Sequence, residues 1–188
     1  MLRETIPQDW LPSVKEHLPE VLVDHAHLER KAATSSINLE KYRVLYPHVE
    51  ELNAIAIEEL QHFQLLLALL KRRGIPFGQP YPSLWITGLM RSVRSGIQHQ
   101  AIDHLLCCAL IEGRSCEKFQ LLAQGLRDTD PELATFYASL VESEGNHYAT
   151  YLLMARGIDH PEADRRLDFY LDLDASLIRQ PRLHHTLH

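Results

Sequence analysis

The sequence predicts an all-α protein built around one hydrophobic core. Long stretches rich in Leu, Ala, Glu, Gln and Arg lack internal helix breakers, and the 188 residues include only 8 glycines and 10 prolines. A hydrophobic content of 45% is typical of a globular protein rather than a disordered one. At this length we expect a single domain that spans residues 1–188.

Helix-starting and helix-breaking residues predict the first half of the fold. Pro19 fits the first turn of a helix that runs to about Tyr42, and Pro47 fits the first turn of a second helix that ends at Arg73. The following segment, 75–96, includes three prolines and two glycines in its first 14 residues. It therefore predicts a long crossover with one short helical piece.

The second half of the chain repeats the pattern of two long helices. A third helix is expected at Ile97–Gln124, and a fourth begins at Pro131, with Asp130 as its N-cap, and ends near Gly157. A charged final helix, about Pro161–Arg179, is expected to lie against the bundle from outside. Two helical hairpins joined by one long connection are the ferritin-like arrangement of a four-helix bundle.

Each long helix has an apolar seam, the set of positions three and four residues apart that a bundle buries, and a carboxylate interrupts every seam. In the second and fourth helices the Glu is followed three residues later by a His, so both side chains can reach one ion. We interpret the six seam residues as metal ligands that are catalytic through the metal centre: Glu29, Glu59, His62, Glu112, Glu144 and His147. This is the ligand set of carboxylate-bridged di-iron and di-manganese sites.

The position of both Glu-x-x-His pairs in apolar seams, each preceded by a helix with one seam Glu, supports this interpretation more strongly than the spacing does. About one Glu-x-x-His pair is expected by chance in a chain with 12 histidines, but four buried carboxylates repel one another unless cations accompany them. Two divalent ions would balance them. Glu58 and Glu142 are the alternatives to Glu59 and Glu144, and the seam register favours the latter pair.

The other histidines and the cysteines show no comparable spacing. The histidines on helices are interpreted as ordinary residues, about one in five being a group that supports a ligand or contacts substrate: His25, His27, His99 and His104. A frayed tail is expected for His184, His185 and His188. Cys108 and Cys116 flank Glu112 by one turn on each side, and could line a metal cavity, but we interpret them as small buried hydrophobic residues.

The distribution of charge leaves two interpretations open. A net charge of −6 argues against a nucleic-acid partner, yet no acidic residue lies between Glu59 and Asp103. Five basic residues lie there, and we expect them to gather on one side or end of the bundle, where a polyanion such as RNA could dock: Lys71, Arg72, Arg73, Arg91 and Arg94. Alternatively, they serve solubility or pair with the acidic final helix.

Several classes of protein are disfavoured. The three cysteines form no C-x-x-C pair and no secretion signal is visible, so a reducing cytoplasm is the expected compartment. The longest apolar run, 65–70, is much shorter than the roughly 18 residues of a membrane span. The phosphate-binding glycine motifs and the G-x-S-x-G elbow are absent, which gives nucleotide and acyl-transfer chemistry no support.

Four segments that contain the seam residues resemble the tRNA hydroxylases that act on 2-methylthio-isopentenyl-adenosine: HLERKAA, IEELQHF, LIEGRSCEKF and SEGNHY. The resemblance implies a non-haem di-iron monooxygenase that uses O2 and two electrons to hydroxylate a methyl group of the isopentenyl chain. It implies two iron ions, tRNA as partner and an electron donor, and it carries over the same six ligands. A monomer or dimer is expected.

Two other functions use the same ligand types. A ferritin-like ferroxidase or iron-storage protein would require a closed cage, which light scattering would detect. A manganese catalase-like peroxide scavenger would be identified by metal analysis and a peroxide assay.

Overall fold

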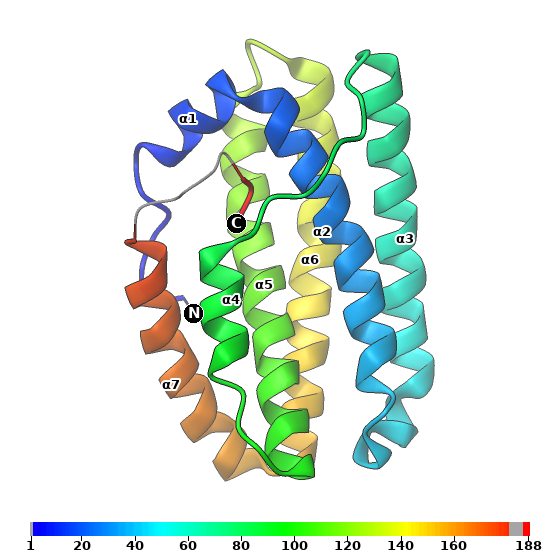
Figure 1. Cartoon of the computed structure of the whole chain (residues 1–188), viewed down its shortest axis with the longest axis vertical. Helices are drawn as coiled ribbons and strands as arrows, with labels where there is room; N and C mark the ends of the chain where they lie inside the picture. The colour runs from blue at the N-terminus through cyan, green and yellow to red at the C-terminus, as the bar shows by residue number, and fades with distance from the viewer. Residues whose placement is uncertain (1, 181–185) are drawn as a thin grey trace.

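The computed structural model describes residues 2–180 and 186–188, and this part of the chain is helical without strands (Figure 1). Two antiparallel hairpins, α2 with α3 and α5 with α6, form the bundle. The helical elements are α1 (Trp10–Glu16), α2 (Leu18–Leu39), the 3₁₀ helix η1 (Arg43–His48), α3 (Val49–Arg72), α4 (Leu84–Arg91), α5 (Ile97–Gly125), α6 (Pro131–Ile158) and α7 (His160–Ile178). The predicted ferritin-like bundle with a long crossover and an additional C-terminal helix is confirmed.

The predicted helix boundaries at the crossover and in the second hairpin agree with the local chemistry. The Asp130 side chain accepts a hydrogen bond from the Leu133 amide at 3.1 Å and caps α6, as predicted. Ser83 caps the short helix of the crossover in the same way. Gly74 and Gly96 have φ of 67° and 93°, a region that favours glycine, and they bound the crossover.

The first hairpin differs from the prediction at its turn and at its start. α2 ends at Leu39 rather than Tyr42, and Pro47 lies inside η1, so α3 begins at Val49. A 3₁₀ helix bonds i to i+3, so the turn continues with helical bonding that breaker residues do not reveal. α1 was not predicted.

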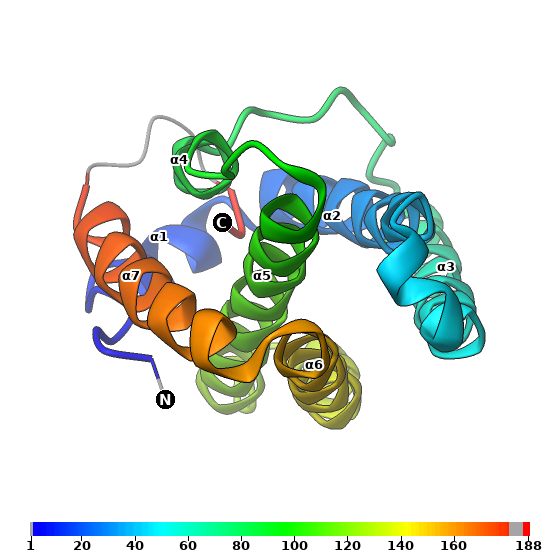
Figure 2. The same cartoon turned by 90° about the horizontal axis from the view of Figure 1, so that it is seen from below.

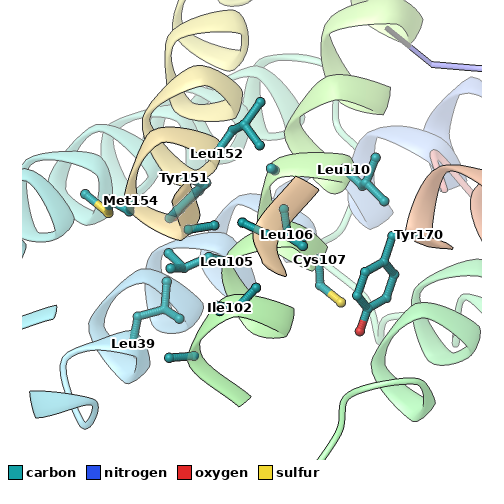
Figure 3. Close-up of a cluster of buried hydrophobic side chains, with 14 of the residues drawn as sticks. Leu39, Ile102, Leu105, Leu106, Cys107, Leu110, Tyr151, Leu152, Met154 and Tyr170 are labelled. Atoms are coloured by element: carbon teal, nitrogen blue, oxygen red, sulfur yellow. The ribbon is translucent and has the colours of Figure 1, made fainter. Parts of the chain in front are cut away.

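Two apolar clusters fill the bundle on either side of the polar seam residues. Along α6, Tyr137 belongs to one cluster and Tyr151 to the other, with Glu144 and His147 between them in sequence. Figure 3 shows side chains of α2, α5, α6 and α7 converging in the cluster that contains Tyr151. The predicted seams are buried except at Cys116, which is half-buried. The polar seam residues therefore lie in the buried interior of the bundle.

α7 packs outside the bundle against α4, α5 and α6, as predicted (Figure 2). A fully buried ion pair between Arg114 of α5 and Asp174 of α7 fixes it there, and Trp85 Nε1 of α4 donates to Asp174 Oδ1 at 2.9 Å. In the described part of the chain, no helix has the combination of length and apolarity that crossing a bilayer requires.

Candidate metal centre

The structure brings the six predicted seam residues together in two overlapping groups. Each residue of a group offers a nitrogen or oxygen within 4.8 Å of those of the others. The first group is Glu29, Glu59, His62 and Glu144, and the second is Glu59, Glu112, Glu144 and His147. Glu59 and Glu144 belong to both, so the arrangement fits two adjacent cations that share two carboxylates.

The atoms of the cluster converge across helices. His62 Nδ1 lies 3.6 Å from Glu29 Oε2 and 3.8 Å from Glu144 Oε1. His147 Nδ1 lies 2.8 Å from Glu59 Oε1 without the geometry of a hydrogen bond. Each hairpin therefore contributes to both halves of the cluster.

Several buried oxygen and nitrogen atoms of the cluster have no hydrogen-bond partner among the described residues. All six residues are at most 7% exposed. Within the described residues, both carboxylate oxygens of Glu59, Oε1 of Glu144 and Nδ1 of His62 and of His147 have no hydrogen-bond partner. Buried polar atoms without partners are costly, and carboxylate oxygens and imidazole nitrogens are ligands of iron, manganese and zinc. The donor set therefore fits divalent transition metals.

Three of the four carboxylates of the cluster have raised pKa values. Burial, together with the nearby charge of Glu59, raises the pKa of Glu112 to about 8. Burial and Glu112 raise the pKa of Glu144 well above its usual value. Burial and Glu29 also raise the pKa of Glu59. Without cations, these three carboxyl groups therefore bind protons more readily than a carboxyl group in water.

The imidazoles also hold protons. Burial would lower the pKa of His62, but the neighbouring carboxylates of Glu29 and Glu59 outweigh it and raise that pKa to about 10. At His147, burial would also lower the pKa, but the neighbouring Glu59 outweighs burial and the pKa rises to about 9. Glu29 is the exception: burial would raise its pKa, but the neighbouring Glu59 and His25 hold it well below the usual value.

We expect the metal-free protein to lose stability as the pH rises from 6 to 9. The raised pKa values of Glu112, His62 and His147 mean that the folded state retains protons that the unfolded chain has released. The free energy of unfolding must then fall with pH, and each kcal/mol lowers the Tm by roughly 2–4 °C at this chain length. Thermal unfolding at both pH values measures this. The metal-loaded protein is the control, and an equal or higher Tm at pH 9 without metal would contradict the expectation.

Two residues outside the cluster orient its members. His25 is fully buried and its Nε2 hydrogen-bonds Glu29 Oε1, while its ring stacks on Tyr137 at 5.5 Å. Nε2–H of His147 donates to Glu58 Oε2 at 3.0 Å, which leaves Nδ1 facing the cluster. Glu58 is 47% exposed at its side chain, so burial favours Glu59 over this alternative.

Burial decides the second alternative in the same way. Glu142 is exposed, whereas Glu144 is buried within the cluster. The sequence contained a spacing that could have identified His25, because it precedes Glu29 by four residues on the same helix face.

A cavity of about 650 Å³ leads to the cluster between α2, α4 and α5. Glu29, Glu112 and Glu144 of the cluster are among the residues that line it. Much of the remaining wall is apolar and comes from Leu39, Ile86, Met90, Cys108 and Ile111. Burial raises the pKa of the Cys108 thiol well above its usual range, so it lines the cavity as a small apolar group. Cys116 is not part of this wall.

The predicted basic residues do not gather at one end of the bundle. Three follow one another at the end of α3, and two lie at or just after the end of α4, and these helix ends lie at opposite ends of the bundle (Figure 1). The expectation of a single end is wrong because the crossover runs along the bundle before α5 begins. Arg73 pairs with Asp130, and Arg94 pairs with Asp103 and with Glu162 of the acidic final helix.

A different basic set, which sequence reasoning missed, lines the cavity. Arg30, Lys31 and Lys41 contribute to its wall. Arg30 and Lys31 directly follow Glu29 in the sequence. Only the tertiary fold brings them to the same cavity as residues of α4 and α5. Three positive charges therefore lie beside the route to the cluster.

The expectation of a frayed tail is wrong for His188. Its ring is 6% exposed and stacks on Trp85 with centroids 5.1 Å apart. A single buried residue has no periodicity, so the sequence could not predict this position. His184 and His185 lie outside the described residues.

A bundle of two helical hairpins that buries four carboxylates and two histidines is a ferritin-like bundle with a candidate metal centre. A solved protein from Synechococcus, described as having aldehyde deformylating oxygenase activity, shares this fold. It is 31% identical with a TM-score of 0.91, and the alignment covers 100% of this chain and 94% of that one.

The family model described as tRNA-(MS[2]IO[6]A)-hydroxylase (MiaE) matches residues 1–188, and the chain belongs to this family. Two relatives are named tRNA 2-(methylsulfanyl)-N(6)-isopentenyladenosine(37) hydroxylase. The one from Pseudomonas putida is 33% identical over 177 residues, which are 93% of this chain and 85% of the relative. The one from Salmonella typhimurium is 38% identical over 124 residues, 66% of this chain and 45% of the relative.

Proposed function

We propose that the protein hydroxylates the isopentenyl group of 2-methylthio-isopentenyl-adenosine in tRNA at a di-iron centre. The observation that carries this proposal is the buried carboxylate and histidine cluster, in a chain of the hydroxylase family, at the inner end of a largely apolar cavity. The six ligands, iron as the metal and O2 as co-substrate are parts of the proposal.

Each hairpin supplies residues specific to one ion. One ion would be held with Glu29 and His62, the other with Glu112 and His147, and Glu59 and Glu144 would be shared. When bound, the iron pair supplies the activation of O2 that hydroxylation of an unactivated C–H bond requires. The protein must position the methyl group and exclude water.

The cavity suits a substrate that is apolar at one end and anionic around it. Ile86, Met90 and Ile111 offer apolar contacts to a prenyl chain. Arg30 and Lys31 can contact phosphates, which dominate the affinity of proteins for nucleic acids. The modified base would have to leave its stack in the RNA loop to enter.

The basic residues predicted from the sequence remain weaker candidates for RNA contact. In the described part of the chain, Arg72 and Arg73 pair with Glu132, and Arg94 pairs with acidic residues, whereas Lys71 and Arg91 form no ion pair. The residues along the cavity are therefore the first phosphate contacts that we propose.

The proposal includes partners that a hydroxylation requires. An electron donor must supply two electrons for each O2 used. We further propose one domain over residues 1–188, a monomeric or dimeric state, and a cytoplasmic location, where tRNA is modified.

We expect iron-loaded protein with O2 and a reductant to convert tRNA that carries the 2-methylthio-isopentenyl group and to leave tRNA that lacks it unchanged. The prenyl group must enter the apolar cavity to reach the cluster. A base without this group has no methyl group there to oxidise. Mass spectrometry of the digested nucleosides measures the product. Absence of hydroxylated nucleoside with fully loaded protein would refute the substrate assignment.

A second candidate is an oxygenase that acts on an aldehyde, which the structural similarity to the Synechococcus protein favours. The same iron-loaded protein, offered an aliphatic aldehyde in place of tRNA, would then remove the formyl carbon. The basic residues beside the cavity favour tRNA instead, because an uncharged aldehyde gains nothing from them. A closed cage detected by light scattering would indicate the ferritin-like function instead. Bound manganese together with peroxide turnover would indicate the catalase-like function.

A further inference from the structure

Residues Thr186–His188 contact α2, α4 and α5, and Figure 1 shows the C-terminal end of the chain beside α5. Leu187 is 1% exposed and joins the apolar cluster that also contains Leu22 and Phe119. Leu187 and His188 both line the cavity that reaches Glu29, Glu112 and Glu144. This short segment is therefore part of the wall of the proposed substrate site.

Contacts with three helices hold the segment in place. The Leu187 amide donates to Asp24 Oδ2 of α2 at 2.8 Å. His188 Nδ1 lies 2.9 Å from Lys118 Nζ and its Nε2 lies 3.1 Å from Ser115 Oγ, both of α5. Because an ammonium group only donates, Nδ1 accepts, so Nε2 carries the hydrogen and donates to the serine. Stacking on Trp85 of α4 completes the contacts.

The segment lies about one helical turn from the carboxylate cluster. Ser115, the partner of His188, follows Glu112 by three residues on α5. Asp24, the partner of Leu187, precedes His25, which hydrogen-bonds Glu29. An apolar chain that reaches the cluster would therefore meet this segment next.

A second cavity lies on the other side of His188. It measures about 330 Å³ and is lined by Trp10, Trp85 and Leu177 among others. His188 is part of the wall of both cavities. Its ring thus separates the space beside the cluster from additional space that a longer ligand could use.

We propose that Leu187 and His188 form the end wall of the substrate cavity and set the length of the apolar chain that fits beside the metal centre. This inference rests on the proposed function, because it takes the prenyl chain as the group that enters. We therefore expect a five-carbon isopentenyl chain to fit in front of the wall and a ten-carbon geranyl chain to meet it. Pockets discriminate about 10–200-fold for each misfitting methylene, so the wall is a strong determinant of chain length.

The test compares wild-type protein with a Leu187→Ala, His188→Ala double variant on otherwise identical tRNA that carries an isopentenyl or a geranyl group. We expect the ratio of kcat/KM for geranyl over isopentenyl to rise at least about 10-fold in the double variant. Leu133→Ala is the matched control, since Leu133 is fully buried but lines neither cavity. If this kcat/KM ratio is unchanged in the folded double variant, or rises equally in the control, the proposal that Leu187 and His188 form the end wall is wrong.

Binding separates failure of the wall from failure of the proposed function. Pentanol and decanol serve as unreactive probes, and calorimetry measures their affinity for the metal-loaded proteins. The double variant should gain affinity for decanol relative to pentanol by at least about 10-fold, even if no tRNA substrate reacts. An identical preference for the two alcohols in wild type and variant would refute the wall, whereas absent turnover with altered preference would refute only the tRNA substrate.

Discussion

Glu59→Ala is expected to abolish binding of both metal ions and to reduce hydroxylation at least about 100-fold. Glu59 belongs to both groups of the cluster and is completely buried. Loss of a residue that merely supports a ligand already costs 10–100-fold in metal affinity or activity, so loss of a shared ligand should cost more. Metal analysis after loading and dialysis measures the number of irons per chain.

Matched variants show whether the effect belongs to the cluster. Glu142→Ala removes an exposed carboxylate near the ligands of α6 and should leave both irons bound. Glu58→Ala removes only the hydrogen-bond partner of His147, so we expect weaker metal binding rather than none. Two irons retained in Glu59→Ala protein would refute the ligand assignment.

Asp174→Ala is expected to lower the free energy of unfolding by about 3–5 kcal/mol, or the Tm by roughly 6–20 °C. Its carboxylate accepts from Arg114 Nε at 3.0 Å and from Trp85 Nε1 at 2.9 Å, and both members of the ion pair are completely buried. The substitution leaves a buried guanidinium with its main partner missing. Arg114 keeps Glu117, which places the loss toward the lower end of the range.

Thermal and denaturant unfolding measure this loss. Asp172→Ala on the same helix is the control, because Asp172 pairs with Arg3 at the surface, where ion pairs contribute at most about 1 kcal/mol. Equal Tm values for the two variants would show that the buried pair does not hold α7 against the bundle.

The long helices could be predicted because each repeats its apolar seam over several turns. Pro131 and Asp130 gave an accurate start for α6 for a local reason, since the cap is formed by neighbouring residues. α1 has seven residues and includes a proline, too short a stretch for periodicity to appear. The burial of His188 depends on residues 70 or more positions away.

The same distinction applies to the site. The convergence of the six seam residues follows from their mid-helix positions, which a bundle must bring to one level. The cavity does not follow from any one helix, because α2, α4 and α5 form it jointly. For the basic residues, proximity in sequence did not predict proximity in space. Arg73 and Arg94 are separated by a crossover that runs along the bundle.

We propose that this buried cluster uses O2 to hydroxylate the prenyl group of tRNA. Turnover of iron-loaded protein under ¹⁸O2 in ordinary water, followed by mass spectrometry of the nucleosides, tests it most directly. We expect the new hydroxyl group to carry ¹⁸O in wild-type protein and no such product to form with Glu59→Ala. A hydroxyl group that carries oxygen from water, or product formation by the variant at the wild-type rate, would contradict it.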